Sequence, residues 1–144
     1  MINVKAPRES VRRFFRAIEK GDMEGVRNSI TPDLINKVHM VKDKRLIPLH
    51  LASRNGHMEI VLFLIENGVD IDAPDERMTT AIIHASQWGR HEIAMLLASH
   101  GADISHQDWY GRSALSCYTD DMKQEQLRIA ATAAKHRNYN DNVG

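Results

Sequence analysis

Residues 43–75 read DKRLIPLHLASRNGHMEIVLFLIENGVDIDAPD, and residues 76–108 read ERMTTAIIHASQWGRHEIAMLLASHGADISHQD. The two stretches share small, acidic and apolar residues at a spacing of 33, among them the pairs Ala52 and Ala85, Gly56 and Gly89, Gly68 and Gly101, Asp70 and Asp103, and Asp75 and Asp108. A fixed period of this length is typical of a stacked repeat array, in which no single unit can bury its own apolar face. The repeat therefore indicates a protein that works by presenting a surface.

Length and composition fit one ordinary domain. The 144 residues include 19 basic and 19 acidic side chains, so net charge gives no indication of a nucleic-acid or membrane partner. Cys117 is the only cysteine, which excludes an internal disulfide and favours a reducing compartment. The N-terminus does not resemble a secretory signal, and no apolar run approaches the roughly 20 residues of a membrane helix. We expect a cytoplasmic or nuclear protein that is monomeric when free.

The middle of the chain predicts two pairs of helices. Pro48 suits a first helical position, and Gly56 ends a short helix that Pro48 opens. A second helix is predicted over residues 58–67, and Thr80 is expected to cap the next one, over 81–88. The fourth helix is predicted over 92–100. The intervening stretches, 69–77 and 102–110, are expected to form turns or short hairpins.

Both ends look like degenerate copies of the same unit. Upstream, Ala17 and Gly21 match Ala52 and Gly56 at an offset of 35, and an irregular connection then leads to Asp43. Downstream, a fourth unit opens at Asp108 and closes with a helix predicted over 124–136. Atypical ends are expected of capping units, whose outer faces meet water. The predicted organisation is one domain over residues 1–137, with repeats at 11–42, 43–74, 75–107 and 108–136, followed by a flexible tail at 138–144.

The stretch Ile47-Pro48-Leu49-His50-Leu51-Ala52, followed by Gly56-His57, Ile60-Val61 and Gly68, resembles the ankyrin repeat. The resemblance implies an all-α ankyrin-repeat solenoid of helix-turn-helix units joined by short β-hairpin loops. Three positions depart from the family pattern. Ile47 replaces the threonine expected beside His50, Ile83 occupies the histidine position of the next unit, and Met78 replaces a turn glycine, so we expect that turn to be distorted.

The sequence offers little for catalysis or metal binding. No two of the eight histidines lie at i, i+4 on a helix, and His50 is better explained as a structural histidine of the family. Cys117 is expected to be a buried small hydrophobic residue rather than a reactive thiol. Asp120 and Asp121 could form an acid–base pair, but they are more simply explained as ending or kinking a helix. We therefore expect no enzyme activity, no cofactor and no metal.

Charge is uneven along the chain in spite of its zero sum. Residues 1–20 carry six basic and two acidic side chains, whereas residues 59–76 carry six acidic side chains and no lysine or arginine. One interpretation is ordinary solvated helix faces and turns. The other is a bipolar surface that attracts an oppositely patterned partner. Because nucleic acid would require basic and aromatic residues on one continuous face, the acidic middle argues against it.

The resemblance also implies where a partner would dock, since ankyrin-like arrays bind through their loop tips and the exposed positions of each first helix. Carried over to this chain, the partner-binding candidates are Asp43, Lys44, Leu46, Arg54, Asn55, Glu76, Arg77, Thr79, Gln87, Trp88, Trp109, Tyr110 and Arg112. Both tryptophans of the chain are among them, and Trp, Tyr and Arg are enriched among interface hot spots. The alternative for Trp88 is that it fills space against the neighbouring hairpin, and Trp109 could likewise cover the last repeat.

The expected function is non-catalytic protein–protein binding through the concave face and loop tips. A module of this kind could be an adaptor, which needs two separable sites. It could equally be a masking inhibitor or regulator, which occludes the working surface of one partner, such as a signalling factor, an enzyme or a toxin. The fold alone does not decide between them.

Overall fold

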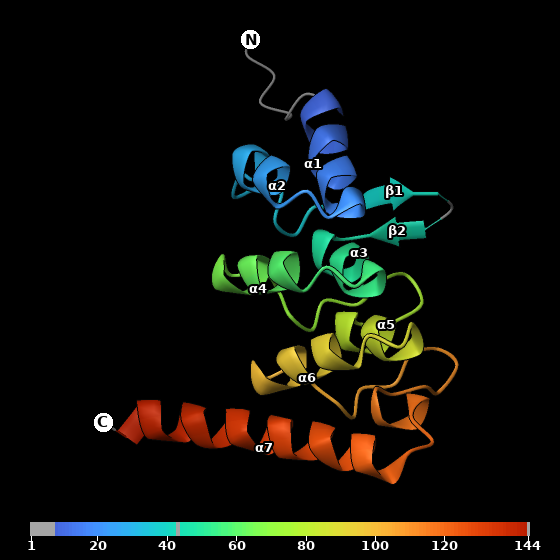
Figure 1. The fold of residues 1–144 in the computed structure, drawn as a ribbon, viewed down its shortest axis with the longest axis vertical. Helices are drawn as coiled ribbons and strands as arrows, with labels where there is room; N and C mark the ends of the chain where they lie inside the picture. The colour runs from blue at the N-terminus through green and yellow to red at the C-terminus, as the bar shows by residue number, and fades with distance from the viewer. Residues whose placement is uncertain (1–7, 43, 144) are drawn as a thin grey trace.

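The computed structural model describes residues 8–42 and 44–143, with side chains up to Arg137. Its elements are α1 (Arg8–Lys20), α2 (Met23–Ser29), β1 (His39–Val41), β2 (Lys44–Leu46), α3 (Pro48–Asn55), α4 (Met58–Glu66), α5 (Ala81–Gln87), α6 (His91–Ser99), the 3-10 turn η1 (Leu115–Cys117) and α7 (Asp121–Val143). Figure 1 shows helix pairs stacked in layers, with α1, α3 and α5 in one column, α2, α4 and α6 in the other, and α7 running across the end of the stack. The β1–β2 hairpin and the long loops project on the side of the first column, as an all-α ankyrin solenoid requires.

The four middle helices lie within one residue of their predicted ends. Pro48 occupies the first turn of α3, where its missing N–H costs no hydrogen bond. The connection expected to be irregular contains β1, which pairs antiparallel with β2 and sets His39 opposite Leu46. Within the described residues this hairpin contains the only strands, and the later loop tips are turns.

One core of buried apolar side chains runs through the whole stack, from Val11 in α1 to Leu127 in α7. Each layer contributes fully buried residues, such as Ile18, Leu49 and Ile82, and the first helices of neighbouring layers contact one another, α1 with α3 and α3 with α5. Burying one such side chain stabilises a fold by about 1.5–3 kcal/mol. Because these contacts join neighbouring units, each layer depends on the next for its stability.

His50 is a structural residue, as expected, and it ties its own unit to the loop that follows. Its Nδ1 accepts a hydrogen bond from the Ile47 N–H (3.4 Å), and its Nε2 lies 2.7 Å from the Ala73 carbonyl oxygen, to which it donates. Burial of the imidazole, reinforced by the nearby His84 ring, lowers the pKa of His50 to about 4. His50 is therefore neutral at physiological pH.

The next unit keeps a histidine in this network one position later. Ile83 occupies the family position, but His84 Nε2 lies 3.0 Å from Asp75 Oδ2, and the His84 ring is 5.3 Å from that of His50. The expected capping by Thr80 was wrong in part. Thr80 stands at the N-cap position of α5, but its buried hydroxyl makes no hydrogen bond.

Gly56 shows why a glycine ends the first helix of a unit. Its φ of 84° lies in the left-handed region, which disfavours any residue with a Cβ. A Cβ here would also lie 2.9 Å from the Arg90 guanidinium of the next unit. Arg90 reaches this place to donate from Nε to the Arg54 carbonyl (3.3 Å), so the glycine leaves room for a contact between units.

The last unit differs from the expectation at both ends. Its first helix is reduced to η1, and its second extends beyond residues 124–136 to span Asp121–Val143. The backbone is therefore helical where a flexible tail was expected, because no Gly or Pro interrupts this stretch. Asp120 caps α7 by accepting from the Met122 N–H (2.9 Å), which gives the pair Asp120–Asp121 a structural role. None of the helices described is long and apolar enough to cross a bilayer.

Candidate partner-binding face

The last loop tip is organised by the buried carboxylate of Asp108. Its Oδ1 accepts from the backbone N–H groups of Tyr110 (2.9 Å) and Arg112 (3.0 Å). Its Oδ2 lies 2.8 Å from Arg112 Nη2 and also accepts from Arg112 Nε at 2.9 Å. Burial alone would raise the pKa of Asp108, but these hydrogen bonds and the guanidinium charge outweigh it and lower the pKa. The ionised carboxylate therefore fixes the backbone that carries Tyr110 and Arg112.

Asp75 organises the preceding tip in the same way. Its Oδ1 accepts from the N–H groups of Arg77 and Thr79, each at 2.9 Å. Burial would raise the pKa of Asp75, but the hydrogen bond with His84 and those two backbone bonds lower it to about 2. The organising role of the two aspartates was not predicted, although their recurrence at one place in successive units was a signal that could have found it.

The turn at Met78 is not distorted in the way its missing glycine suggested. Met78 adopts a φ of 61°, close to the 75° of Gly111 at the same place in the last unit. A side chain in this left-handed conformation costs about 1–2 kcal/mol. The tip therefore has the same backbone shape as the last one, and the cost of a methionine in place of glycine is backbone strain at Met78.

The structure brings residues of three units together around one shallow hollow of about 680 Å³ on the loop-tip side. It is lined by Lys44, Arg77, Gln87, Trp88, Tyr110, Arg112 and Cys117. Six of these seven are partner-binding candidates from the sequence. They converge because β2, the end of α5 and the two loop tips lie on successive layers of the stack.

Side chains in the hollow contact one another and the neighbouring Arg54. The Arg54 guanidinium stacks 4.5 Å from the centre of the Trp88 ring, and that of Arg112 lies 4.7 Å from the Tyr110 ring. With its amide oriented so that the oxygen accepts, Gln87 lies 3.1 Å from Arg112 Nε. Trp88 is still 50% exposed and Tyr110 61% exposed. The cation–π contacts therefore hold the rings in place without covering them.

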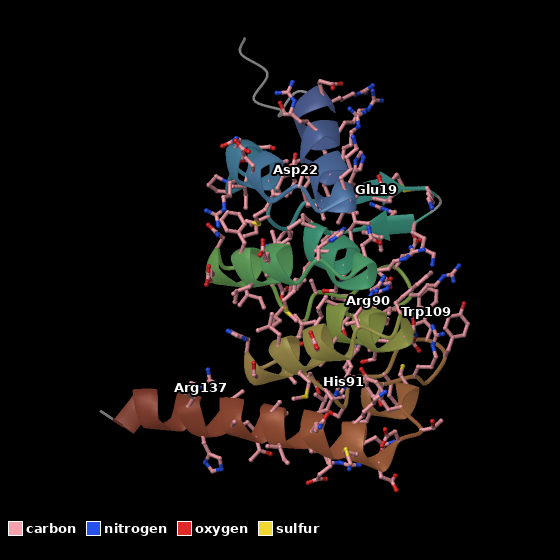
Figure 2. The ribbon with its side chains drawn as sticks, viewed as in Figure 1. Glu19, Asp22, Arg90, His91, Trp109 and Arg137 are labelled. Atoms are coloured by element: carbon pink, nitrogen blue, oxygen red, sulfur yellow. The ribbon has the colours of Figure 1, made fainter. Side chains whose placement is uncertain are left out.

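The remaining exposed candidates lie outside the hollow. Trp109 is 71% exposed at the last loop tip (Figure 2). Its backbone N–H donates to the Arg77 carbonyl (3.0 Å) and so joins two neighbouring tips. Glu76 is exposed at the same tip as Arg77, and Asn55 is half-buried at the end of α3. Trp109 is thus separate from the other two aromatic residues of the predicted cluster.

Two candidates, Leu46 and Thr79, are buried and not exposed as predicted, and a third lies outside the described residues. Successive side chains of β2 point to opposite faces of the hairpin, and that of Leu46 points to the core and is buried. Thr79 is buried because its hydroxyl turns inward, 3.4 Å from Asp108 Oδ2. The candidate outside the described residues is Asp43.

One cysteine, Cys117, lies at this face. Cys117 is half-buried at the edge of the hollow instead of fully buried as expected, because η1 provides only one turn of helix to cover it. Burial raises the pKa of the Cys117 thiol, which disfavours the reactive thiolate. In the part of the chain that the structure describes, no three or more His, Cys, Asp or Glu residues are placed to hold a metal ion.

Comparison with known proteins agrees with this architecture. The family model for ankyrin repeats matches residues 14–108 with three copies. Similar proteins include a "Probable E3 ubiquitin-protein ligase" of Oryza sativa subsp. japonica, 33% identical over 104 residues, which are 72% of this chain and 21% of the relative. Another is "Ankyrin repeat and SAM domain-containing protein 6" of Mus musculus, 30% identical over 128 residues, which are 87% of this chain and 14% of the relative.

A third relative is the "B-cell lymphoma 3 protein homolog" of Mus musculus, 41% identical over 71 residues, which are 49% of this chain and 16% of the relative. The chain thus spans about a fifth or less of the length of these three proteins. The similarity covers the repeat array, which in this family is an interaction fold rather than a catalytic one. The matched repeats and the stacked helix pairs together establish that the chain belongs to the ankyrin-repeat family.

Proposed function

We propose that this chain is a non-catalytic module that binds a partner protein through its concave face and loop tips. The observation that carries the proposal is the exposure of Trp88, Trp109 and Tyr110 beside basic residues on one side of the stack. The repeat framework does not need these rings, because the corresponding places one unit earlier hold Asn55, Glu76 and Arg77. Large exposed aromatic residues next to arginine are the composition of interface hot spots.

Affinity capture from native lysate tests the proposal with a matched pair of variants. The first is Trp88→Ala/Trp109→Ala/Tyr110→Ala, which removes the exposed rings. The control is Met122→Ala/Ile129→Ala on α7, which removes apolar side chains that are 69% and 61% exposed. Circular dichroism confirms that each variant is folded. We expect a partner that the wild type and the control retain and the aromatic variant loses; equal capture by all three would refute this face as the binding site.

The composition of the captured complex separates the two modes of action that we consider. An adaptor would hold two different proteins at once, whereas a masking inhibitor or regulator would form a complex with one partner and block its activity. We propose action in the cytosol or nucleus. The mass of the purified complex and an activity assay of the captured protein distinguish the two modes.

We further propose that residues 108–136 act as a fourth, capping unit beyond the three matched copies. In support, α7 packs along α6, and Leu127 is fully buried in the common core. The outer side of α7 carries exposed polar residues, as a cap requires. Truncation before Asp108 is expected to lower the midpoint of thermal unfolding; an unchanged midpoint would contradict a capping role.

A further inference from the structure

The hollow differs from its surroundings in the sign of its charge. Three of its lining side chains are cations (Lys44, Arg77 and Arg112), and none of the described lining residues is Asp or Glu. Arg54 adds a fourth positive charge over the ring of Trp88. The surface is therefore locally basic in a chain whose net charge is zero.

The buried carboxylates of Asp75 and Asp108 do not line the hollow. The side chain of Asp108 has no exposed surface, and it forms an ion pair with Arg112. Asp75 is likewise turned inward, where its oxygens bond to two backbone N–H groups and to His84. Among the described residues, neither Lys44, Arg54 nor Arg77 has a carboxylate within ion-pair distance. These three cations can therefore pair with groups that another molecule supplies.

Another hollow, of about 640 Å³, lacks this character. It lies between α1 and α2, and Arg13, Arg16 and Lys20 share its lining with Asp22 and Asp33. Its lining thus contains carboxylates as well as cations, and it contains no aromatic ring. The hollow at the loop tips differs in that its described lining contains cations without a carboxylate and two exposed aromatic rings, Trp88 and Tyr110.

We infer that this hollow receives an acidic segment of a partner protein, an inference that rests on the proposed function. Carboxylates of the segment meet Lys44, Arg54 and Arg77, and an apolar or aromatic side chain packs between Trp88 and Tyr110. Complementary charge of this kind speeds association and rejects wrong partners, while the rings contribute most of the affinity.

A protein segment fits this surface better than a nucleic acid does. A polyanion needs a continuous basic face to follow its phosphates. Here the basic area is confined to one hollow, and Glu76 is exposed at the same tip as Arg77. Further exposed acidic residues lie in α4 and the loop after it, which precede this tip in the chain: Glu59, Glu66, Asp70 and Asp72. A short segment that fits within the hollow does not need the continuous basic face that a polyanion requires.

The test is a selection from displayed random dodecapeptides on the full chain, followed by fluorescence-anisotropy titration of the enriched peptides. We expect enriched peptides to be net negative and to carry an aromatic or large aliphatic residue. Reversing two charges with Lys44→Glu/Arg77→Glu should weaken binding at least about tenfold. The control, Lys123→Glu/Lys135→Glu on α7, makes the same change in net charge away from the hollow and should leave affinity unchanged.

Several outcomes would overturn the inference. These are enrichment of neutral or basic peptides, enrichment of none, equal weakening by both charge-reversed variants, and tighter binding of single-stranded oligothymidylate than of the acidic peptides. The capture experiment with the aromatic variant is independent of all four. If capture depends on the rings while the selection fails, the acidic-segment inference falls and the proposed function stands.

Discussion

The buried histidine of the second unit makes the stability of this protein depend on pH. His50 is neutral in the folded protein down to about pH 4, whereas an unfolded histidine takes up a proton below its ordinary pKa of 6.5. Between these values the unfolded state binds more protons, so the free energy of unfolding falls as pH is lowered. The difference in pKa gives a loss of about 2 kcal/mol on going from about pH 7 to about pH 5.

The assay is urea unfolding followed by circular dichroism at the two pH values, for the wild type and for His50→Gln. Glutamine is polar and does not titrate, so the variant should lack this loss, whatever it costs in hydrogen bonds at neutral pH. Groups that titrate identically in both proteins cancel in the comparison. An equal loss of stability in the two proteins would mean that folded His50 accepts a proton at no cost, and it would refute the reasoning from burial.

Three further substitutions test the packing of the units and tips, each by thermal unfolding. Gly56→Ala should destabilise the protein by about 1–2 kcal/mol because the φ of Gly56 is positive. It should cost more than Gly89→Ala, because a Cβ at residue 56 meets Arg90 whereas one at residue 89 meets nothing. An equal cost of the two substitutions would show that the contact with Arg90 does not matter. Met78→Gly should stabilise by up to about 1 kcal/mol by relieving left-handed strain, and a lower midpoint would show that its side chain matters more. Asp108→Asn should cost about 1.5–3 kcal/mol, since it weakens charged hydrogen bonds of the last tip; a neutral result would show that the carboxylate does not organise it.

Some properties of the candidate face follow from sequence position within the unit. Trp88 and Tyr110 are exposed at the positions that the resemblance to the ankyrin repeat predicted to face a partner. The inward turn of Leu46 and Thr79 depends on contacts that the pattern does not contain. Leu46 faces the core because of its register in the hairpin, and Thr79 is drawn toward an aspartate of the next unit. Position within a repeat therefore predicted the exposure of Trp88 and Tyr110, but it did not predict side-chain directions that depend on strand register or on a contact with the next unit.

The sequence by itself determined the repeat, the helix pairs and most helix ends, because these depend on local signals such as Pro48 and Gly56 and on apolar periodicity. Only the tertiary structure decided that Lys44, Trp88 and Tyr110, which are far apart in the chain, line one hollow. Their meeting depends on the stacking of successive layers. The tertiary structure also decided that the side chains of Asp75 and Asp108 turn inward and do not line the hollow. The net charge of the chain is zero, and the hollow is positive because folding turns Asp75 and Asp108 inward while Lys44, Arg77 and Arg112 line the surface.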